Sequence, residues 1–181
     1  MQGVVSMHRE LEELFEELEA LRNDYFSTDE FNDDLYKRDV PDKWSVGEVI
    51  CHCWLLLKYF RMISRVYNPP ARMLLKLSCQ SPAGYDAHME NIYAGETMKA
   101  PAFLVPDMKR EYSKGELRMM LEVQTEKLKR ALEGLDRDAL YRIRYPDPVA
   151  GWPNIIQSVK LAKIHEAHHY GIVLERVREN R

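Results

Sequence analysis

Cysteine is scarce in this sequence, which has only Cys51, Cys53 and Cys79 among its 181 residues. An odd number of cysteines cannot pair completely, and the Cys-x-Cys spacing of the first two differs from the Cys-x-x-Cys of redox and zinc sites. A disulfide framework is therefore not expected, and we predict a reducing, cytoplasmic environment.

An excess of charge of one sign is also missing. Lysine and arginine together number 26 and aspartate and glutamate 29, so the formal net charge is −3. A chain this close to neutrality has no long-range field that attracts nucleic acid or an anionic membrane. We expect neither of them as a partner.

Long hydrophobic runs are absent as well. The apolar run at residues 54–57 ends at Lys58, far short of the roughly 20 residues that a membrane-spanning helix needs. The first ten residues resemble neither a secretory signal nor a transit peptide. Because 45% of the residues are nonetheless hydrophobic, length and composition predict one folded domain over residues 1–181.

Helical periodicity is what the sequence does contain. Apolar residues recur three and four positions apart in four segments, and no segment alternates with period two, so strands are expected to be minor or absent. The pattern predicts an all-α fold, a four-helix bundle. The expected helices cover residues 4–25, 45–67, 113–132 and 154–178.

Capping and stop signals set these boundaries. The second helix is expected to stop before Pro69 and Pro70, and the third at Gly134. Three helices open on a capping box, in which a small polar residue is followed three positions later by Glu or Gln: Ser45 with Glu48, Ser113 with Glu116, and Asn154 with Gln157.

A long connection, residues 68–112, separates the second and third helices. A connection of this length in a compact domain is usually functional, a lid or the wall of a pocket. It is equally the crossover that a bundle needs to bring its helices into a non-sequential order. Both interpretations stay open at this point. A shorter connection, residues 135–153, is predicted without a helix.

The last helix carries three histidines within five residues. At about 100° per residue, His169 lies about 40° and His168 about 60° from His165, on the apolar face that also holds Leu161 and Ile172. Residues four apart on a helix can point their rings at one ion, so His165 and His169 have the spacing of a helical metal-binding pair. Taken alone, such a pair is more often a detail of core packing.

The position of His52 favours the metal site. It lies in the second helix on the same apolar face as Leu56 and Ile63. Two helices of one bundle then present histidines to a shared interior, which is where bundles build metal sites. We predict that His52, His165 and His169 bind a metal ion and leave an open coordination position, as catalytic sites do.

Other polar residues near the predicted site receive a structural interpretation. Glu48, one turn before His52, is assigned to its capping box rather than to the metal. Cys51 and Cys53 point about 100° to either side of His52 and are interpreted as packing residues. Tyr59 is a weak candidate for a general base.

Three histidines remain outside the predicted ligand set. His168 is expected to pack or to hydrogen-bond beside the site and is a second weak candidate for a general base. His8 and His88 have no partner at a meaningful spacing. The catalytic residues are therefore left unassigned.

Two motifs in the chain resemble those of a known family. The segment WSVGEVICH at residues 44–52 is similar to the start of the second helix in the DinB/YfiT-like superfamily, and HEAHHYGI at residues 165–172 is similar to the signature of its last helix. Gly171 departs from that signature, where the family often has glutamine. The order and separation of the motifs also match, so the resemblance covers nearly the whole chain.

The resemblance implies a fold, a cofactor and a class of reaction. The fold is a bundle with helices in up-down-down-up order, often a homodimer, and the cofactor is a divalent metal ion, zinc or nickel, on His52, His165 and His169. Characterised relatives include bacillithiol-dependent S-transferases and mycothiol-dependent maleylpyruvate isomerases. The isomerase branch commonly has Glu where this chain has His165, which favours the transferase branch.

The expected function is thus a metal-dependent enzyme, a thiol-dependent S-transferase acting on small electrophiles with a low-molecular-weight thiol as co-substrate. One alternative is a metal-dependent hydrolase that uses the same ligands. Another is a non-catalytic metal-binding helical protein that acts through dimerisation or in a stress response.

Overall fold

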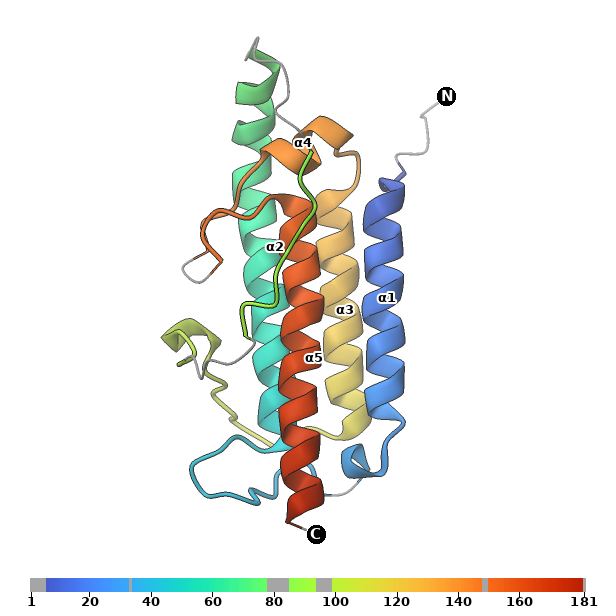
Figure 1. Ribbon diagram of the computed structural model, residues 1–181, viewed down its shortest axis with the longest axis vertical. Helices are drawn as coiled ribbons and strands as arrows, with labels where there is room; N and C mark the ends of the chain where they lie inside the picture. The colour runs from blue at the N-terminus through green and yellow to red at the C-terminus, as the bar shows by residue number, and fades with distance from the viewer. Residues whose placement is uncertain (1–5, 33, 78–84, 94–98, 148–149, 181) are drawn as a thin grey trace.

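Four long helices lie side by side along one axis, and a short helix sits across one end (Figure 1). The computed structural model describes residues 6–32, 34–77, 85–93, 99–147 and 150–180. No strand occurs among these residues, only isolated bridges, so the all-α prediction is confirmed. The helices are α1 (Arg9–Phe26), α2 (Val46–Leu77), α3 (Lys114–Leu132), α4 (Arg137–Arg142) and α5 (Ile155–Glu179), with short 3-10 helices η1 (Asp29–Phe31) and η2 (Ala102–Leu104).

The directions of the helices explain the long connection after α2. In Figure 1, α1 and α5 run downward, whereas α2 and α3 both run upward. Since α2 and α3 are consecutive and run the same way, the chain between them must return along the length of the bundle. Its described part at residues 85–93 lies along α5, where backbone carbonyls of Asp86 and His88 accept hydrogen bonds from Asn154 and Gln157 at 2.7 and 2.9 Å.

The predicted capping boxes are present at the helix starts. Ser113 and Glu116 cap α3, and Asn154 and Gln157 cap α5, each through reciprocal hydrogen bonds. At the start of α2, the Ser45 backbone N–H donates to Glu48 at 2.8 Å and the Glu48 N–H donates to the Ser45 hydroxyl at 3.3 Å. Gly134, with a φ of 67°, follows the end of α3 as predicted.

The predicted end of α2 is wrong. The helix continues through Pro69 and Pro70 to Leu77. The two prolines remove N–H groups that would pair with the carbonyls of Arg65 and Val66, but all four residues are exposed, so water can satisfy these carbonyls.

Two smaller boundaries also differ from the sequence prediction. Helix α1 begins at Arg9 rather than near residue 4, because His8 is extended and caps it, its Nδ1 accepting from the Glu10 N–H at 3.4 Å. Helix α4 was not expected, because six residues are too few to show a period. Asp136 caps it by accepting from the Ala139 N–H at 2.8 Å.

An ion pair lies inside the core at the contact between α1 and α5. Arg22 is fully buried and forms two parallel hydrogen bonds to Glu166, from Nε to Oε2 at 2.8 Å and from Nη2 to Oε1 at 2.6 Å. Its Nη1 donates to Glu19 at 2.6 Å and to Thr125 of α3 at 2.8 Å. Tyr170 donates a further hydrogen bond to Glu166 at 3.2 Å.

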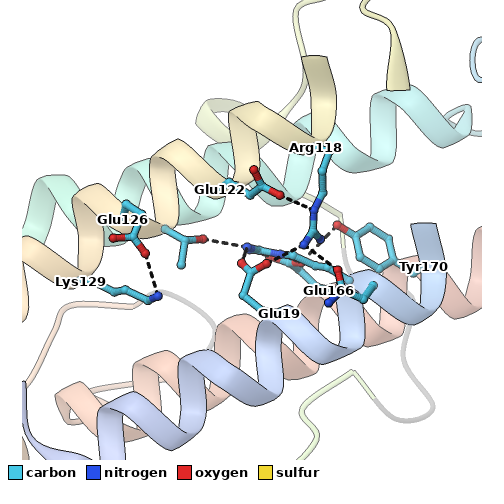
Figure 2. A network of polar contacts seen from close by, with 10 residues as sticks. Glu19, Arg118, Glu122, Glu126, Lys129, Glu166 and Tyr170 are labelled. Carbon is cyan, nitrogen blue, oxygen red and sulfur yellow. Dashed lines mark hydrogen bonds and ion pairs between the residues drawn. The ribbon is translucent and has the colours of Figure 1, made fainter. Parts of the chain in front are cut away.

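The network reaches the surface through Arg118 (Figure 2). Arg118 of α3 pairs with Glu19 and with Glu122, both at 2.7 Å. Three helices are thereby joined by directional contacts around Glu166. Because Glu166 directly follows His165 in the chain, this network fixes the rotation of α5 beside the predicted site.

Candidate metal centre

The three predicted ligands come together between α2 and α5. The ring centroids of His52, His165 and His169 form a nearly equilateral triangle, with sides of 4.7, 4.7 and 4.4 Å. One nitrogen of each ring lies within 4.8 Å of the others, which makes them a group that could hold a metal ion. In the described part of the chain, no other group of histidine, cysteine or carboxylate side chains meets this criterion.

His52 is oriented by the backbone of the long connection. Its Nδ1 lies 2.7 Å from the carbonyl oxygen of Leu104 in η2, so Nδ1 carries the proton and donates it. The lone pair of Nε2 is then directed at Nε2 of His165, 3.0 Å away. A metal-binding histidine usually donates its second N–H to a carbonyl or carboxylate in this way.

These distances fit a first-row divalent ion. Nitrogens that bind zinc at about 2.0–2.1 Å in tetrahedral geometry lie roughly 3.3 Å apart. The closest pair here is at 3.0 Å and all three nitrogens lie within 4.8 Å of one another, so one ion could reach all three rings. The other nitrogen of His165, Nδ1, is buried without a hydrogen-bond partner, unlike its counterpart in His52.

The histidines are held neutral, the form in which imidazole binds a metal. Burial is the main cause that lowers the pKa of His52, and it lowers that of His165 far below its usual value. Burial and the neighbouring His52 and His168 lower the pKa of His169 to about 3. At neutral pH a cation therefore meets unprotonated rings.

The lowered pKa values predict that the metal-free protein loses stability on acidification. The unfolded chain takes up protons on its histidines near pH 6.5, whereas the folded chain resists this, down to about 3 for His169. The stabilisation is therefore complete above about pH 6.5 and decreases below it, by up to about 1.4 kcal/mol per pH unit for each histidine kept neutral.

Urea unfolding of chelator-treated protein between about pH 7 and about pH 5 measures this slope, in a range where most carboxylates stay ionised. The variant His169→Asn should lose the contribution of one histidine. A slope as steep in this variant as in the wild type would contradict the assignment.

A cavity of about 460 Å³ opens over the histidines. Trp44, whose ring centroid lies 4.8 Å from that of His52, forms part of its wall, together with Leu56 and Val173. The volume falls in the range of small-molecule sites, which are largely apolar with a few polar groups.

The long connection supplies another wall of this cavity. Tyr93 stacks on His168 with ring centroids 5.1 Å apart and also contacts His165 at 5.3 Å. Phe103 and Leu104 of η2 line the cavity as well. The connection therefore joins two helices that run the same way, and its described parts line the cavity.

The other residues that the sequence analysis discussed near the site are Glu48 and the cysteines. Glu48 pairs with Arg38 and caps α2, and it is not part of the histidine group. Cys51 and Cys53 are buried free thiols outside that group, and Cys79 lies outside the described residues.

The two candidates for a general base both line the cavity. Tyr59 donates to the carbonyl of Pro146 at 3.0 Å, and burial raises its pKa, so it stays protonated. His168 is partly buried and burial lowers its pKa. His88 is an exposed side chain 3.9 Å from Glu90 and plays no part in the site.

The residues of the cavity wall that sequence reasoning missed include Trp44, Tyr93 and Arg176. Arg176 had a usable signal, because it lies seven residues after His169 and so continues the same helix face. Trp44 was noted only as part of a motif. Tyr93 lies in an irregular segment with no periodicity, and no sequence pattern indicates that it contacts the histidines.

Fold and site together define a class: a helical bundle in which two buried histidines and one partly buried histidine could hold a metal ion and line a cavity of small-molecule size. The family model of the DinB superfamily matches residues 7–173, and the chain belongs to this superfamily. Searches of curated proteins and of solved structures found no match. None of the described helices combines the length and apolarity needed to cross a membrane.

Proposed function

We propose that this protein is a metal-dependent enzyme that transfers a low-molecular-weight thiol to a small electrophile. The observation that carries the proposal is the convergence of His52, His165 and His169 in the lining of one cavity. The proposal includes zinc or nickel as the ion and a homodimer, which the family resemblance implies, and a cytoplasmic location, which the cysteine content favours.

The geometry suggests a role for each residue of the site in this reaction. His52, His165 and His169 would hold the ion, and His52 is kept in the correct tautomer by Leu104. A divalent ion held by these residues would lower the pKa of a bound thiol toward neutral pH. His168, which stacks on Tyr93 at the cavity wall, would accept the proton that the thiol releases.

Neither of the two described cysteines is suited to supply the reacting thiolate. Burial raises the pKa of Cys51 to about 11, and burial also raises the pKa of Cys53 well above its usual value. Both thiols stay protonated and are poor nucleophiles. The cavity, of about 460 Å³, has room for a small thiol beside an electrophile, and apolar side chains such as Leu56 line it.

The test is a conjugation assay with cysteine or glutathione as the thiol and chlorodinitrobenzene as the electrophile. The thiol loses its proton, the sulfur forms a bond to the ring carbon, and chloride leaves with the electron pair. We expect zinc- or nickel-loaded protein to accelerate this reaction and chelator-treated protein to lose the acceleration. His88→Asn, an exposed histidine away from the cavity, is the matched control and should keep it.

Two results would contradict the proposal. The first is that metal-loaded protein fails to accelerate conjugation for every thiol and electrophile in a broad panel, which identifies a non-catalytic metal binder. Metal-dependent cleavage of esters or amides in the absence of thiol identifies a hydrolase built on the same ligands.

A further inference from the structure

Three cationic side chains line the cavity above the histidines: Lys43, Lys99 and Arg176. Asp42 and Asp147 are the carboxylates of the same lining, and Asp147 already accepts the Ala150 N–H at 2.7 Å. Three cationic side chains thus face two carboxylates around this space. The lining therefore favours a negatively charged ligand.

Arg176 is the cation built most firmly into the wall. Its Nη2 donates to the backbone carbonyl of Trp44, and its Nε is buried with no hydrogen-bond partner. Asp39 attracts this guanidinium electrostatically but is itself paired with Lys37 at 3.3 Å. A buried donor without an acceptor is unfavourable, so the guanidinium still has hydrogen bonds to give.

The position of Arg176 relates it to the metal-binding histidines. It lies seven residues after His169 on α5, so it is on nearly the same face of the helix and about 10 Å further along. Between them Ile172 and Val173 contribute an apolar surface to the cavity. The guanidinium is anchored on Trp44, whose ring contacts His52. Along this helix the cavity is therefore lined first by the cation Arg176, then by an apolar surface, and then by the histidine group.

We propose that this cavity binds a small organic carboxylate, with the carboxylate on Arg176 and the apolar part over Ile172 and Val173, directed toward the three histidines. The planar guanidinium fork matches the two oxygens of a carboxylate. This inference rests on the proposed function, because it names the substrate class of the same site. Binding of a carboxylate at Arg176 can nevertheless be measured without any reaction taking place.

The test compares two probes of the same shape, phenylacetate and phenylacetamide, by calorimetric titration of the full-length protein with and without chelator. A charge-assisted hydrogen bond corresponds to roughly a 10- to 100-fold preference for the carboxylate. Arg176→Gln should reduce this preference to near one. Arg178→Gln, which removes the same charge two residues later from a side chain paired with Glu30 at 3.0 Å, should keep it.

Arg176→Lys provides a second variant, which keeps the charge but not the fork and should retain only part of the preference. Equal binding of the two probes by the wild type, no binding of phenylacetate, or a preference that survives in Arg176→Gln overturns the inference. A preference that survives in Arg176→Gln but disappears with chelator places the anion on the metal, which also overturns it. Failure of the proposed function is seen separately, as absent metal binding or absent conjugation.

Discussion

Replacing His165 by alanine is expected to lower the affinity for Zn²⁺ or Ni²⁺ by at least about 100-fold. Structural zinc binding is worth about 10–16 kcal/mol over four ligands, so one ligand accounts for about 3 kcal/mol, or a factor of ~100. His165 is buried next to the other two histidines. Among the described residues, no fourth histidine, cysteine or carboxylate belongs to this group, so none is in place to replace His165 as a ligand. Competition titration against a chromogenic chelator measures the affinity.

The matched control is His168→Ala. This histidine lies three residues further on α5 and lines the same cavity but is not part of the ligand group. It should keep metal binding within about 10-fold of the wild type, the smaller end of effects seen for neighbours of metal ligands. Stoichiometric metal in His165→Ala at wild-type affinity would show that the ion is held elsewhere.

Replacing Arg22 by methionine is expected to destabilise the fold by about 3–5 kcal/mol. The substitution leaves Glu166 buried, at 1% exposure, without the guanidinium that donates two of its hydrogen bonds. A charge without a partner in the core costs more than the pair contributes, which is why the loss of one partner has so large an effect. Urea unfolding at neutral pH measures the change.

Two further variants separate the buried pair from surface electrostatics. Arg22→Met combined with Glu166→Leu removes both charges and should recover most of the lost stability. Arg9→Met breaks the pair with Glu13 at 2.7 Å, in which the arginine is 88% exposed, and should leave the free energy of unfolding nearly unchanged. If the double variant is no more stable than Arg22→Met, the cost lies in packing rather than in an unpaired charge.

The sequence predicted the features that depend on local chemistry. Capping boxes such as Ser113 with Glu116 need only residues three apart, and the helix face that carries His165 and His169 follows from helical geometry. His52 could be added because an apolar face of one bundle helix must meet the faces of the others. The helical bundle and the histidine group could therefore be predicted from the sequence.

Features that depend on which helices touch were not predicted. Arg22 lies four residues after Leu18, on the apolar stripe, and a charge there indicates a buried partner. The partner, Glu166, is 144 residues away and only the packing of α1 against α5 identifies it. The continuation of α2 beyond Pro69 also could not be predicted from local sequence, because it depends on which side of the helix faces water.

The hydrogen bond that orients His52 is made to a main-chain carbonyl, at Leu104, rather than to a side chain. Every amino acid supplies that oxygen, so point substitutions at this position leave the acceptor in place. Insertions or deletions between α2 and α3 would move it. We therefore expect the metal affinity of related chains to tolerate wide variation in the residues of this connection but to be sensitive to its length and path.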